Sequence, residues 1–498
     1  MFDLAIIGGG VNGTGIARDA SGRGLKVLLA EKSDLAAATS SSSSKLIHGG
    51  LRYLELYDFR LVREALGERD ILLRTAPHII WPLRFVLPHT PDQRPAWLLR
   101  LGLVLYDNLA WRPFGQRSSL PRSHGVDLHD PDLGGGLKPE LKRGFAYSDC
   151  WVDDARLVAL IARDAADRGA QILTRTAVTR ARSDGESWLV SLRHADGHDQ
   201  TIRARAIVNA AGPWAGEVLG TTLGINATAT LRLIKGSHIV VRRRYPGSHA
   251  FILQNDDGRV VFLIPYEGAY TLIGTTDVPF ERDAGDPSIE ESEIAYLCRA
   301  ANRYLAQPVS AADVVWSYAG VRPLYDDGQQ NASAVTRDYV LDLHGDAGQP
   351  KALSVFGGKI TTFRRLAEHA LDRLAPSFPA MGASWTSHAA LPGGDIASGD
   401  FAAFAAEQAR ARPWLEPAHL HGLARRHGTR LSRLLEGARD TQDLGRHFGA
   451  GLYAREIDWL RKEEFAVTAA DVLWRRTKAG LHLDQRQRDD VAGYIADT

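Results

Sequence analysis

The chain has 498 residues, of which 44% are hydrophobic and 24% charged, and its formal net charge is +1. These values are typical of a soluble globular protein of about three domains, and they predict no nucleic-acid partner. The two cysteines, Cys150 and Cys298, belong to no Cys/His cluster, so neither a disulfide framework nor a metal site is predicted. The N-terminus lacks the basic segment of a signal peptide, and no apolar run approaches the roughly 20 residues that span a bilayer.

The first 31 residues predict a βαβ unit. An apolar run at 2–7 ends in glycine, as a buried parallel strand does, and 11–23 suit a helix that ends at Gly24. A second apolar strand at 25–30 leads to Glu31. This order of strand, helix and strand is the opening of an α/β domain.

The loop between the first strand and the helix fits the pattern G-x-G-x-x-G at Gly8, Gly10 and Gly13. Such glycines permit a tight turn, a close approach to a pyrophosphate and close strand–helix packing. The helix N-terminus supplies amide donors, and Glu31 is placed to accept from ribose hydroxyls and to oppose a 2′-phosphate. The loop therefore predicts a dinucleotide site, although by itself it fits NAD as well as FAD.

The middle of the chain predicts a helix at 154–168 followed by an antiparallel meander with turns at 183–185 and 195–197. Residues 288–291 predict a capping box that opens a helix ending near 304. Leu391 marks a boundary after which helices predominate, at 402–412, 415–427 and 431–438. The strands predicted between residues 172 and 273 are 172–179, 188–192, 202–208, 238–241, 250–254, 260–264 and 270–273.

Short motifs along nearly the whole chain, in the family's order, resemble those of the bacterial, aerobic type of FAD-dependent glycerol-3-phosphate dehydrogenase. One departure is Ala211, where members of this family carry threonine, which removes one hydroxyl near the cofactor. The segments that carry the resemblance are 38–54, 142–145, 147–157, 208–214, 233–238, 274–277, 320–324, 336–339, 356–362 and 473–478.

The resemblance implies an α/β + α fold: a Rossmann-like FAD-binding domain of the glutathione-reductase/D-amino acid oxidase type, an antiparallel-sheet substrate domain and a C-terminal α-helical domain. The FAD-binding domain is expected in three parts, 1–75, 146–215 and 321–390. Residues 76–145 are expected to form a helical insertion that faces the membrane, 216–320 the substrate-binding sheet and 391–498 the helical domain.

The resemblance also implies which residues contact FAD, with adenine near Val178. Small and hydroxylated residues let the chain lie close to the flavin, and the helix after Thr361 points its amides at the flavin N1–C2=O. For any single serine, ordinary turn chemistry is an equal alternative. The expected FAD contacts are Gly8, Gly10, Val11, Asn12, Gly13, Glu31, Lys32, Thr39, Ser40, Ser44, Lys45, Leu46, His48, Gly49, Gly50, Val178, Ala211, Gly212, Trp214, Gly357, Gly358, Lys359, Ile360 and Thr361.

The implied reaction is hydride transfer from C2 of sn-glycerol 3-phosphate to flavin N5, giving dihydroxyacetone phosphate. A phosphate calls for arginine, and Arg52, Arg322 and Arg337 lie in family motifs. His48 is the expected base, with a structural hydrogen bond as its alternative, and Lys359 is a second candidate. Tyr53 is expected to orient a substrate hydroxyl.

The resemblance further implies ubiquinone as electron acceptor, attachment to the cytoplasmic face of the inner membrane and a homodimer. Between Arg94 and Arg122, apolar residues such as Trp97 and Leu101 recur at helical spacing among arginines. Such a basic amphipathic helix can lie on anionic lipid, or it can be an ordinary helix packed on the core. A glycine or D-amino acid oxidase on the same fold, and a non-enzymatic flavoprotein scaffold, are the alternative functions.

Overall fold

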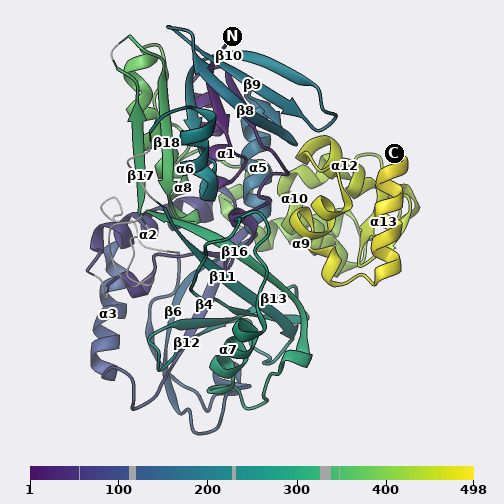
Figure 1. The fold of residues 1–498 in the computed structure, drawn as a ribbon. Helices are drawn as coiled ribbons and strands as arrows, with labels where there is room; N and C mark the ends of the chain where they lie inside the picture. Colours follow the sequence, from purple (N-terminus) through teal and green to yellow (C-terminus); the bar gives the residue numbers. More distant parts are fainter. Residues whose placement is uncertain (55–56, 111–118, 227–230, 326–337, 347) are drawn as a thin grey trace.

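The protein is described by a computed structural model over residues 1–54, 57–110, 119–226, 231–325, 338–346 and 348–498. Figure 1 shows three units: a sheet flanked by helices at the top, a second sheet below it and a group of helices at one side. Within the described residues, no helix is long and apolar enough to cross a membrane.

The first sheet is built around the predicted N-terminal strand, which lies between two parallel neighbours. Helices α1 (Val11–Gly22), α5 (Asp154–Asp167) and α8 (Phe363–Leu374) pack on it and on one another. Apolar residues of strand and helix, such as Ile6 and Ile16, are fully buried between these layers. The strand order is β17 (Tyr339–His344), β18 (Lys351–Gly357), β10 (Asp199–Asn209), β1 (Phe2–Ile7), β2 (Val27–Ala30) and β7 (Gln171–Leu173).

One predicted strand, 172–179, proves to be two. Strand β7 pairs parallel with β2, whereas β8 (Thr176–Ser183) pairs antiparallel with β9 (Trp188–His194). Between them Arg175 adopts a φ of 52°, which redirects the chain. A left-handed arginine leaves no glycine signal in the sequence, and the break could therefore not be predicted.

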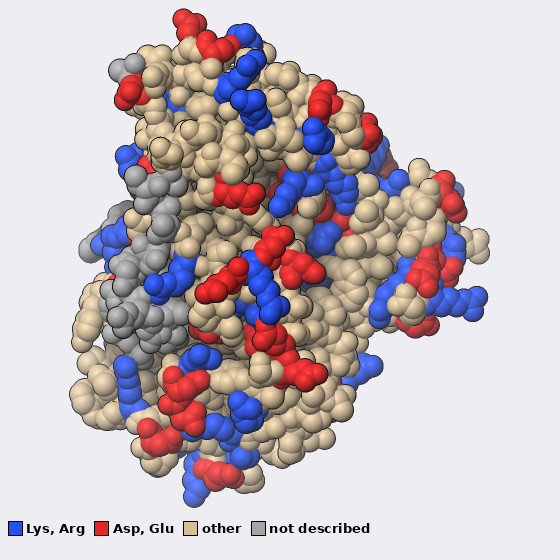
Figure 2. All heavy atoms as spheres, in the orientation of Figure 1, with Lys and Arg blue, Asp and Glu red and all other residues tan. Residues whose placement is uncertain are grey.

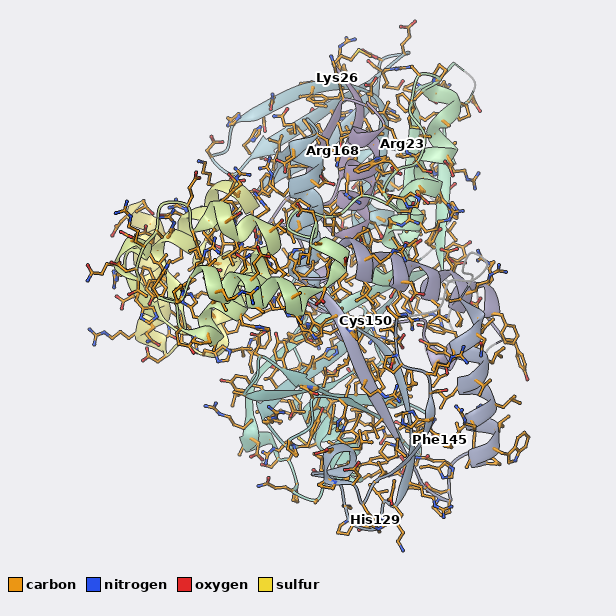
Figure 3. All side chains as sticks on the ribbon, turned by 180° about the vertical axis from the view of Figure 1, so that it is seen from behind. Arg23, Lys26, His129, Phe145, Cys150 and Arg168 are labelled. Atoms are coloured by element: carbon orange, nitrogen blue, oxygen red, sulfur yellow. The ribbon has the colours of Figure 1, made fainter. Side chains whose placement is uncertain are left out.

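The second sheet has ten strands and is antiparallel except for the pairing of β4 with β12. Figure 3, from behind, shows its long strand β6 running from Phe145 to Cys150, towards the first unit. The strands are β15 (Val278–Pro279), β11 (Leu231–Arg242), β14 (Tyr270–Gly274), β13 (Val260–Tyr266), β12 (Ala250–Gln254), β4 (Ile80–His89), β6 (Arg143–Val152) and β3 (Leu46–Ile47) in order, with β16 (Val314–Tyr325) beside β11 and β5 (His124–Asp127) beside β6.

The expectation that 76–145 form a helical insertion is wrong. This region contributes β4, β5 and the start of β6 to the second sheet, and among its described residues the one long helix is α3 (Ala96–Leu109). Strand β4 contains Pro82 and Pro88, and prolines are atypical of a strand interior, so the sequence did not predict a strand there. The strand nevertheless pairs with β6 from Ile80 to His89. The predicted helix near residue 290 is α7 (Glu291–Asn302), and it is capped by Glu290, not by Ser288.

The C-terminal unit is helical, as predicted, with one short strand pair, β19 (His447–Gly449) and β20 (Leu452–Tyr453). Two small apolar cores hold it together, one around Ile457 and one around Leu431. Its helices are α9 (Phe401–Ala411), α10 (Pro417–His427), α11 (Leu431–Leu434), α12 (Ala454–Glu464), the π-helix η11 (Asp471–Arg476) and α13 (Gln485–Asp497).

Candidate cofactor and substrate site

The glycine loop has the geometry that its sequence predicts. Gly8 has a φ of +112°, and a Cβ placed on Gly13 would lie 2.0 Å from the Gly8 carbonyl oxygen. Gly10 is the N-cap residue of α1, and it has no side chain with which to cap the helix. The backbone amide of Val11 donates to Ser40 Oγ at 3.0 Å. These contacts leave no space for side chains at Gly8 and Gly13, and a backbone of this kind at a helix N-terminus suits a phosphate group.

Asn12 joins this loop to the predicted glycine pair near residue 357. Its Nδ2 donates to the Gly357 carbonyl oxygen at 3.3 Å, and a Cβ on Gly358 would lie 3.0 Å from the same nitrogen. The Oδ1 atom of Asn12 is buried and has no hydrogen-bond partner among the described residues. A buried acceptor of this kind is usually satisfied, so it fits a donor supplied by a bound group.

The residues expected at the adenosine end lie together at the tips of the first sheet. Glu31 accepts from the backbone amides of Gly9 at 2.6 Å and Ser33 at 2.7 Å. A carboxylate offers about four lone-pair sites, which leaves room for ribose hydroxyls. Loss of hydration raises the pKa of Glu31, against the effect of these two donors. Lys32 Nζ lies 3.8 Å from the centre of the Trp214 ring.

Val178, Ala211 and Gly212 complete this part of the predicted site. Val178 is half-buried on β8. Ala211 follows β10, and its Cα would lie 3.2 Å from a Cβ on Gly8, directly beside the glycine loop. Gly212 has a φ of +56° and starts the short helix η3 (Gly212–Trp214).

The hydroxyls of the serine-rich segment hold it between the two sheets. Around the short helix η1 (Thr39–Ser41), Thr39 Oγ1 donates to the Val321 carbonyl oxygen at 2.6 Å. Ser44 Oγ lies 2.9 Å from His238 Nε2. A Cβ on Gly320 would lie 2.6 Å from Ser42 Cβ, so β16 runs closely along this segment.

Lys45 is buried, unlike a residue that is open to a ligand. Its side chain is 1% exposed, and its ammonium contacts Asp154 Oδ1 at 2.8 Å and the Ser41 carbonyl oxygen at 3.0 Å. Asp154 also accepts from Ser43 Oγ at 2.7 Å. Lys45 therefore fixes the shape of the segment, and Leu46 follows it in the buried strand β3.

The residues expected around the flavin ring converge from opposite ends of the chain. Lys359 Nζ donates to the His48 carbonyl oxygen at 2.6 Å, and the His48 amide donates to Thr361 Oγ1 at 3.3 Å. Thr361 and Ile360 belong to η6 (Ile360–Thr362), directly before α8. Lys359 Nζ also lies 5.3 Å from the centre of the Tyr53 ring. One site thus contains the predicted base, its alternative and the tyrosine.

Gly49 and Gly50 lie where a side chain would not fit. A Cβ on Gly49 would lie 2.7 Å from Tyr106 Oη, and a Cβ on Gly50 would lie 2.3 Å from the Tyr53 ring. Gly50 has a φ of +86°, which favours glycine independently of the available space. Only glycine therefore fits at these two positions, and the backbone itself forms the surface there.

His48 is neutral in this setting. Loss of hydration is the main cause that lowers its pKa well below the usual value, and the positive charges of Lys359 and Arg69 act in the same direction. A neutral imidazole is able to accept a proton at neutral pH. The two cations also favour negative charge on any group bound beside them.

Arg322 stands on β16 over the second sheet. Its Nη1 contacts Asp277 Oδ1 at 2.5 Å, and its Nη2 donates to the Thr276 carbonyl oxygen at 2.7 Å. A Cβ on Gly236 would lie 2.0 Å from Nη2, so this glycine on β11 makes the space for the guanidinium. The side chain remains 24% exposed.

The other two predicted arginines cannot be placed. The backbone of Arg52 belongs to η2 (Leu51–Leu54), but its side chain lies outside the described residues, as does all of Arg337. The backbones that carry Arg322 and Lys359 lie close together, because a Cβ on Gly357 would lie 3.7 Å from the Pro323 carbonyl oxygen.

Three contact residues were missed by the sequence analysis. Asp154 holds Lys45, His238 contacts Ser44, and Asp277 contacts Arg322. All three lie inside segments that carry the family resemblance, so position within a motif was the available signal. No metal-binding cluster occurs among the described residues, and two cavities, of about 380 and 450 Å³, lie beside His369 and Arg425, away from this site.

Comparison with known proteins matches both parts of the chain to families. The family described as FAD dependent oxidoreductase matches residues 3–364, and the C-terminal domain of alpha-glycerophosphate oxidase matches residues 384–498. The chain is 53% identical to D-erythritol 1-phosphate dehydrogenase of Brucella abortus, over 98% of this chain and 96% of that protein. It is 51% identical to glycerol-3-phosphate dehydrogenase of Pseudomonas aeruginosa, over 99% and 95% respectively.

Among solved structures, the chain resembles the glycerol-3-phosphate dehydrogenase of Bacillus halodurans complexed with FAD. The TM-score is 0.77 at 26% identity, and the match covers 100% of this chain and 94% of that one. The predicted fold class is confirmed by this match and by the two family matches. The glycine loop, the buried Oδ1 of Asn12 and the paired glycines at Gly357 fit the same cofactor.

Proposed function

Because the chain belongs to the FAD-dependent oxidoreductases and binds FAD, we propose that it oxidises sn-glycerol 3-phosphate to dihydroxyacetone phosphate. The observation that carries this proposal is the contact of Lys359 with His48, directly after the glycine pair that Asn12 joins to the cofactor loop. FAD, when bound, supplies the two-electron acceptor for the hydride from C2 of the substrate.

The phosphate of the substrate requires fixed positive charge. Arg322 is held at one end by Asp277 and Thr276, so its guanidinium is oriented before substrate arrives. A planar guanidinium can contact two phosphate oxygens at once. We assign Arg52 and Arg337 to the same phosphate on the family resemblance.

The hydroxyl proton of the substrate requires an acceptor. We assign this role to His48. Burial and the nearby cations lower its pKa, which keeps the imidazole unprotonated but also makes it a weaker base than a free histidine. Lys359 lies against the His48 carbonyl and beside Tyr53, where its charge favours an alkoxide-like oxygen. Lys359 is the alternative acceptor, and Tyr53 orients the hydroxyl.

A second candidate substrate is D-erythritol 1-phosphate, because a relative named for it is 53% identical to this chain. Both compounds are phosphate monoesters of a polyol and call for the same cations. The two are separated by comparing kcat/KM for each with FAD-loaded protein. The larger value identifies the physiological class.

Bleaching of the flavin absorbance tests the reaction itself. We expect glycerol 3-phosphate to bleach the holoenzyme without NAD, and an unchanged spectrum with both polyol phosphates would refute the proposal. An amino-acid oxidase would instead be bleached by glycine or a D-amino acid and form hydrogen peroxide promptly. The solved glycine oxidases resemble this chain at 18% and 21% identity, which speaks for the fold alone.

We further propose that the electrons pass to ubiquinone and that α3 rests on the cytoplasmic face of the inner membrane. Five apolar residues of α3 are exposed, among them Trp97 at 67% and Leu101 at 58%. This helix lies at the left edge of Figure 1, and in Figure 2 the charges on the visible face are of mixed sign. An exposed stripe of five apolar side chains on one helix is unusual unless a partner covers it.

We also infer a homodimer from the resemblance.

Vesicle binding tests the role of α3. We expect the holoenzyme to co-sediment with vesicles of anionic phospholipid and Leu101→Glu to remain in solution. The matched control is Val315→Glu, because Val315 is 49% exposed on a strand of the second sheet. Equal loss of binding in both variants would contradict a docking role specific to α3.

A further inference from the structure

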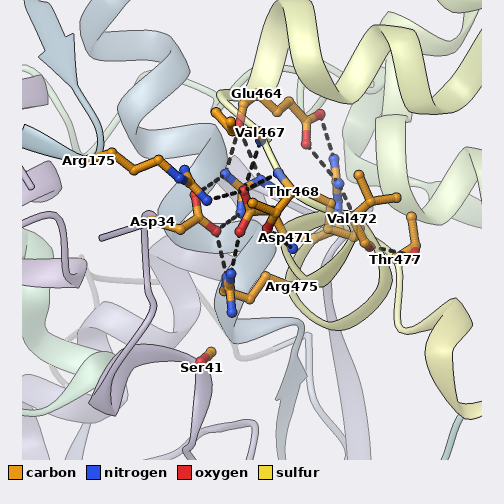
Figure 4. A network of polar contacts seen from close by, with 12 residues as sticks. Asp34, Ser41, Arg175, Glu464, Val467, Thr468, Asp471, Val472, Arg475 and Thr477 are labelled. Carbon is orange, nitrogen blue, oxygen red and sulfur yellow. Dashed lines mark hydrogen bonds and ion pairs between the residues drawn. The ribbon is translucent and has the colours of Figure 1, made fainter. Parts of the chain in front are cut away.

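The C-terminal unit is joined to the cofactor-binding unit by a buried network of charges (Figure 4). Arg476, on η11, contacts Asp34 with two nitrogens, at 2.6 and 2.8 Å, and the side chains are 0% and 1% exposed. Arg475 contacts the same carboxylate at 2.5 Å. Asp34 belongs to the first unit and lies three residues beyond Glu31. Two cations from one end of the chain thus share one carboxylate from the other.

The guanidinium of Arg476 is itself fixed inside the C-terminal unit. Its Nε and Nη2 donate to the Glu464 carbonyl oxygen at 3.0 and 2.8 Å. The Glu464 carboxylate pairs in turn with both terminal nitrogens of Arg156, on α5. Arg156 also donates to the Arg476 carbonyl oxygen at 3.0 Å. Because these contacts fix the Arg476 guanidinium, it sets the position of the Asp34 carboxylate that it binds.

Asp34 begins a segment, 34–45, that covers the glycine loop. Ala36 donates its backbone amide to the Gly9 carbonyl oxygen at 3.1 Å. The side chain of Leu35 is fully buried, and its Cδ2 would lie 3.0 Å from a Cβ on Gly9. Ser40 then accepts from the Val11 amide at the start of α1. The position of Asp34 is therefore transmitted to the backbone that faces the pyrophosphate.

The other end of this segment is held from the same part of the C-terminal unit. Lys478 Nζ contacts Asp153 Oδ1 at 3.2 Å, and Asp153 caps the N-terminus of α5. The next residue, Asp154, binds Lys45 at the end of the segment. Residues 475–478 thus contact Asp34 directly and the Lys45 end through α5.

We propose that Arg475 and Arg476 are positioning residues for FAD, which they retain by fixing Asp34 and so holding segment 34–45 over the glycine loop. Release of FAD requires this segment to move away from Gly9 and Val11. Such movement takes Asp34 out of its bidentate pair, which is unfavourable because the site offers it little water. The C-terminal unit therefore controls how long FAD stays bound.

The rate of FAD release from the full-length holoenzyme tests this proposal, followed by the rise in flavin fluorescence after dilution. We expect Arg476→Met to release FAD about tenfold faster or more, because the buried carboxylate of Asp34 loses its main partner. We expect Arg476→Lys to lie between this variant and the unchanged protein, because one ammonium replaces one arm of the fork.

Two matched controls separate positioning of FAD from general weakening. Arg425→Gln removes a hydrogen bond to the Pro77 carbonyl oxygen, from the C-terminal unit to another part of the chain, without touching Asp34 or its cations. Arg430→Met removes a pair with Glu463 inside the C-terminal unit. We expect each to change the release rate by less than about threefold. Equal acceleration by either control would overturn the proposal.

A milder variant keeps the proposal testable if Arg476→Met does not fold. Arg475→Gln leaves Arg476 in place and removes the second cation from Asp34, together with the ion pair of Arg475 with Asp471, at a side chain that is 18% exposed. We expect release about threefold faster than in the unchanged protein, with an unchanged KM for the polyol phosphate. Release at the unchanged rate from a folded variant, by either substitution, would overturn it.

Discussion

The two ends of the site are built in different ways. The pyrophosphate end is a local structure, because Gly8 to Gly13 follow one strand and open one helix. The substrate end joins His48 to Lys359, which are 311 residues apart, and adds Arg322 from the second sheet. The first end acts through backbone atoms and the second through charged side chains. Substitutions should therefore remove the cofactor at one end and substrate turnover at the other.

The largest expected effect is at the pyrophosphate end. Gly13→Ala should abolish FAD binding, because the new Cβ would lie 2.0 Å from the Gly8 carbonyl oxygen. The ratio of flavin to protein absorbance after purification measures this loss. The control is Gly67→Ala on α2 (Phe59–Thr75), where a Cβ meets nothing within 4 Å. A normal flavin content in Gly13→Ala would contradict the assignment of the loop.

The next effect should spare the cofactor. Arg322→Ala should raise the KM for glycerol 3-phosphate by roughly 100-fold, because a phosphate loses a charged, oriented partner. The flavin absorbance should remain, which is the contrast with Gly13→Ala. Arg193→Ala, on the surface of β9, is the control for loss of one arginine. An unchanged KM would remove Arg322 from the phosphate site.

Buried histidines make the stability of the fold depend on pH. His48 and His238 have pKa values lowered well below 6.5, chiefly by loss of hydration, so the unfolded chain takes up protons first as the pH falls. The free energy of unfolding should therefore fall below about pH 6.5, by up to about 1.4 kcal/mol per pH unit for each histidine. Urea unfolding between pH 7.5 and 5.5 measures it, and a flat profile would contradict the lowered pKa values.

The smallest effect should come from restoring a hydroxyl beside the loop. Ala211 lies against Gly8, and Ala211→Thr should slow FAD release by about threefold if one new hydrogen bond forms with the cofactor. The KM for substrate should not change, because this residue belongs to the cofactor end. Faster release would show that the larger side chain crowds the site.

The same contrast explains how much the sequence could predict. The βαβ opening was predicted because its glycines, strands and Glu31 are neighbours in the chain. The ion pairs of Asp34 and Asp154 could not be predicted, since each carboxylate acquires its role from a cation that is distant in the sequence. The prediction for region 76–145 was wrong for a related reason. Pro82 and Pro88 are atypical of a strand, and β4 is stabilised as one by its pairing with the distant strand β6.

The separation between Asp34 and Arg476, 442 residues, sets an order of events during synthesis. Asp34 is translated long before Arg475 and Arg476. Until these cations are made, the glycine loop and its covering segment lack the charges that pair with Asp34. If Arg475 and Arg476 position FAD as proposed, a chain truncated before residue 475 should retain its flavin less well than the full-length protein.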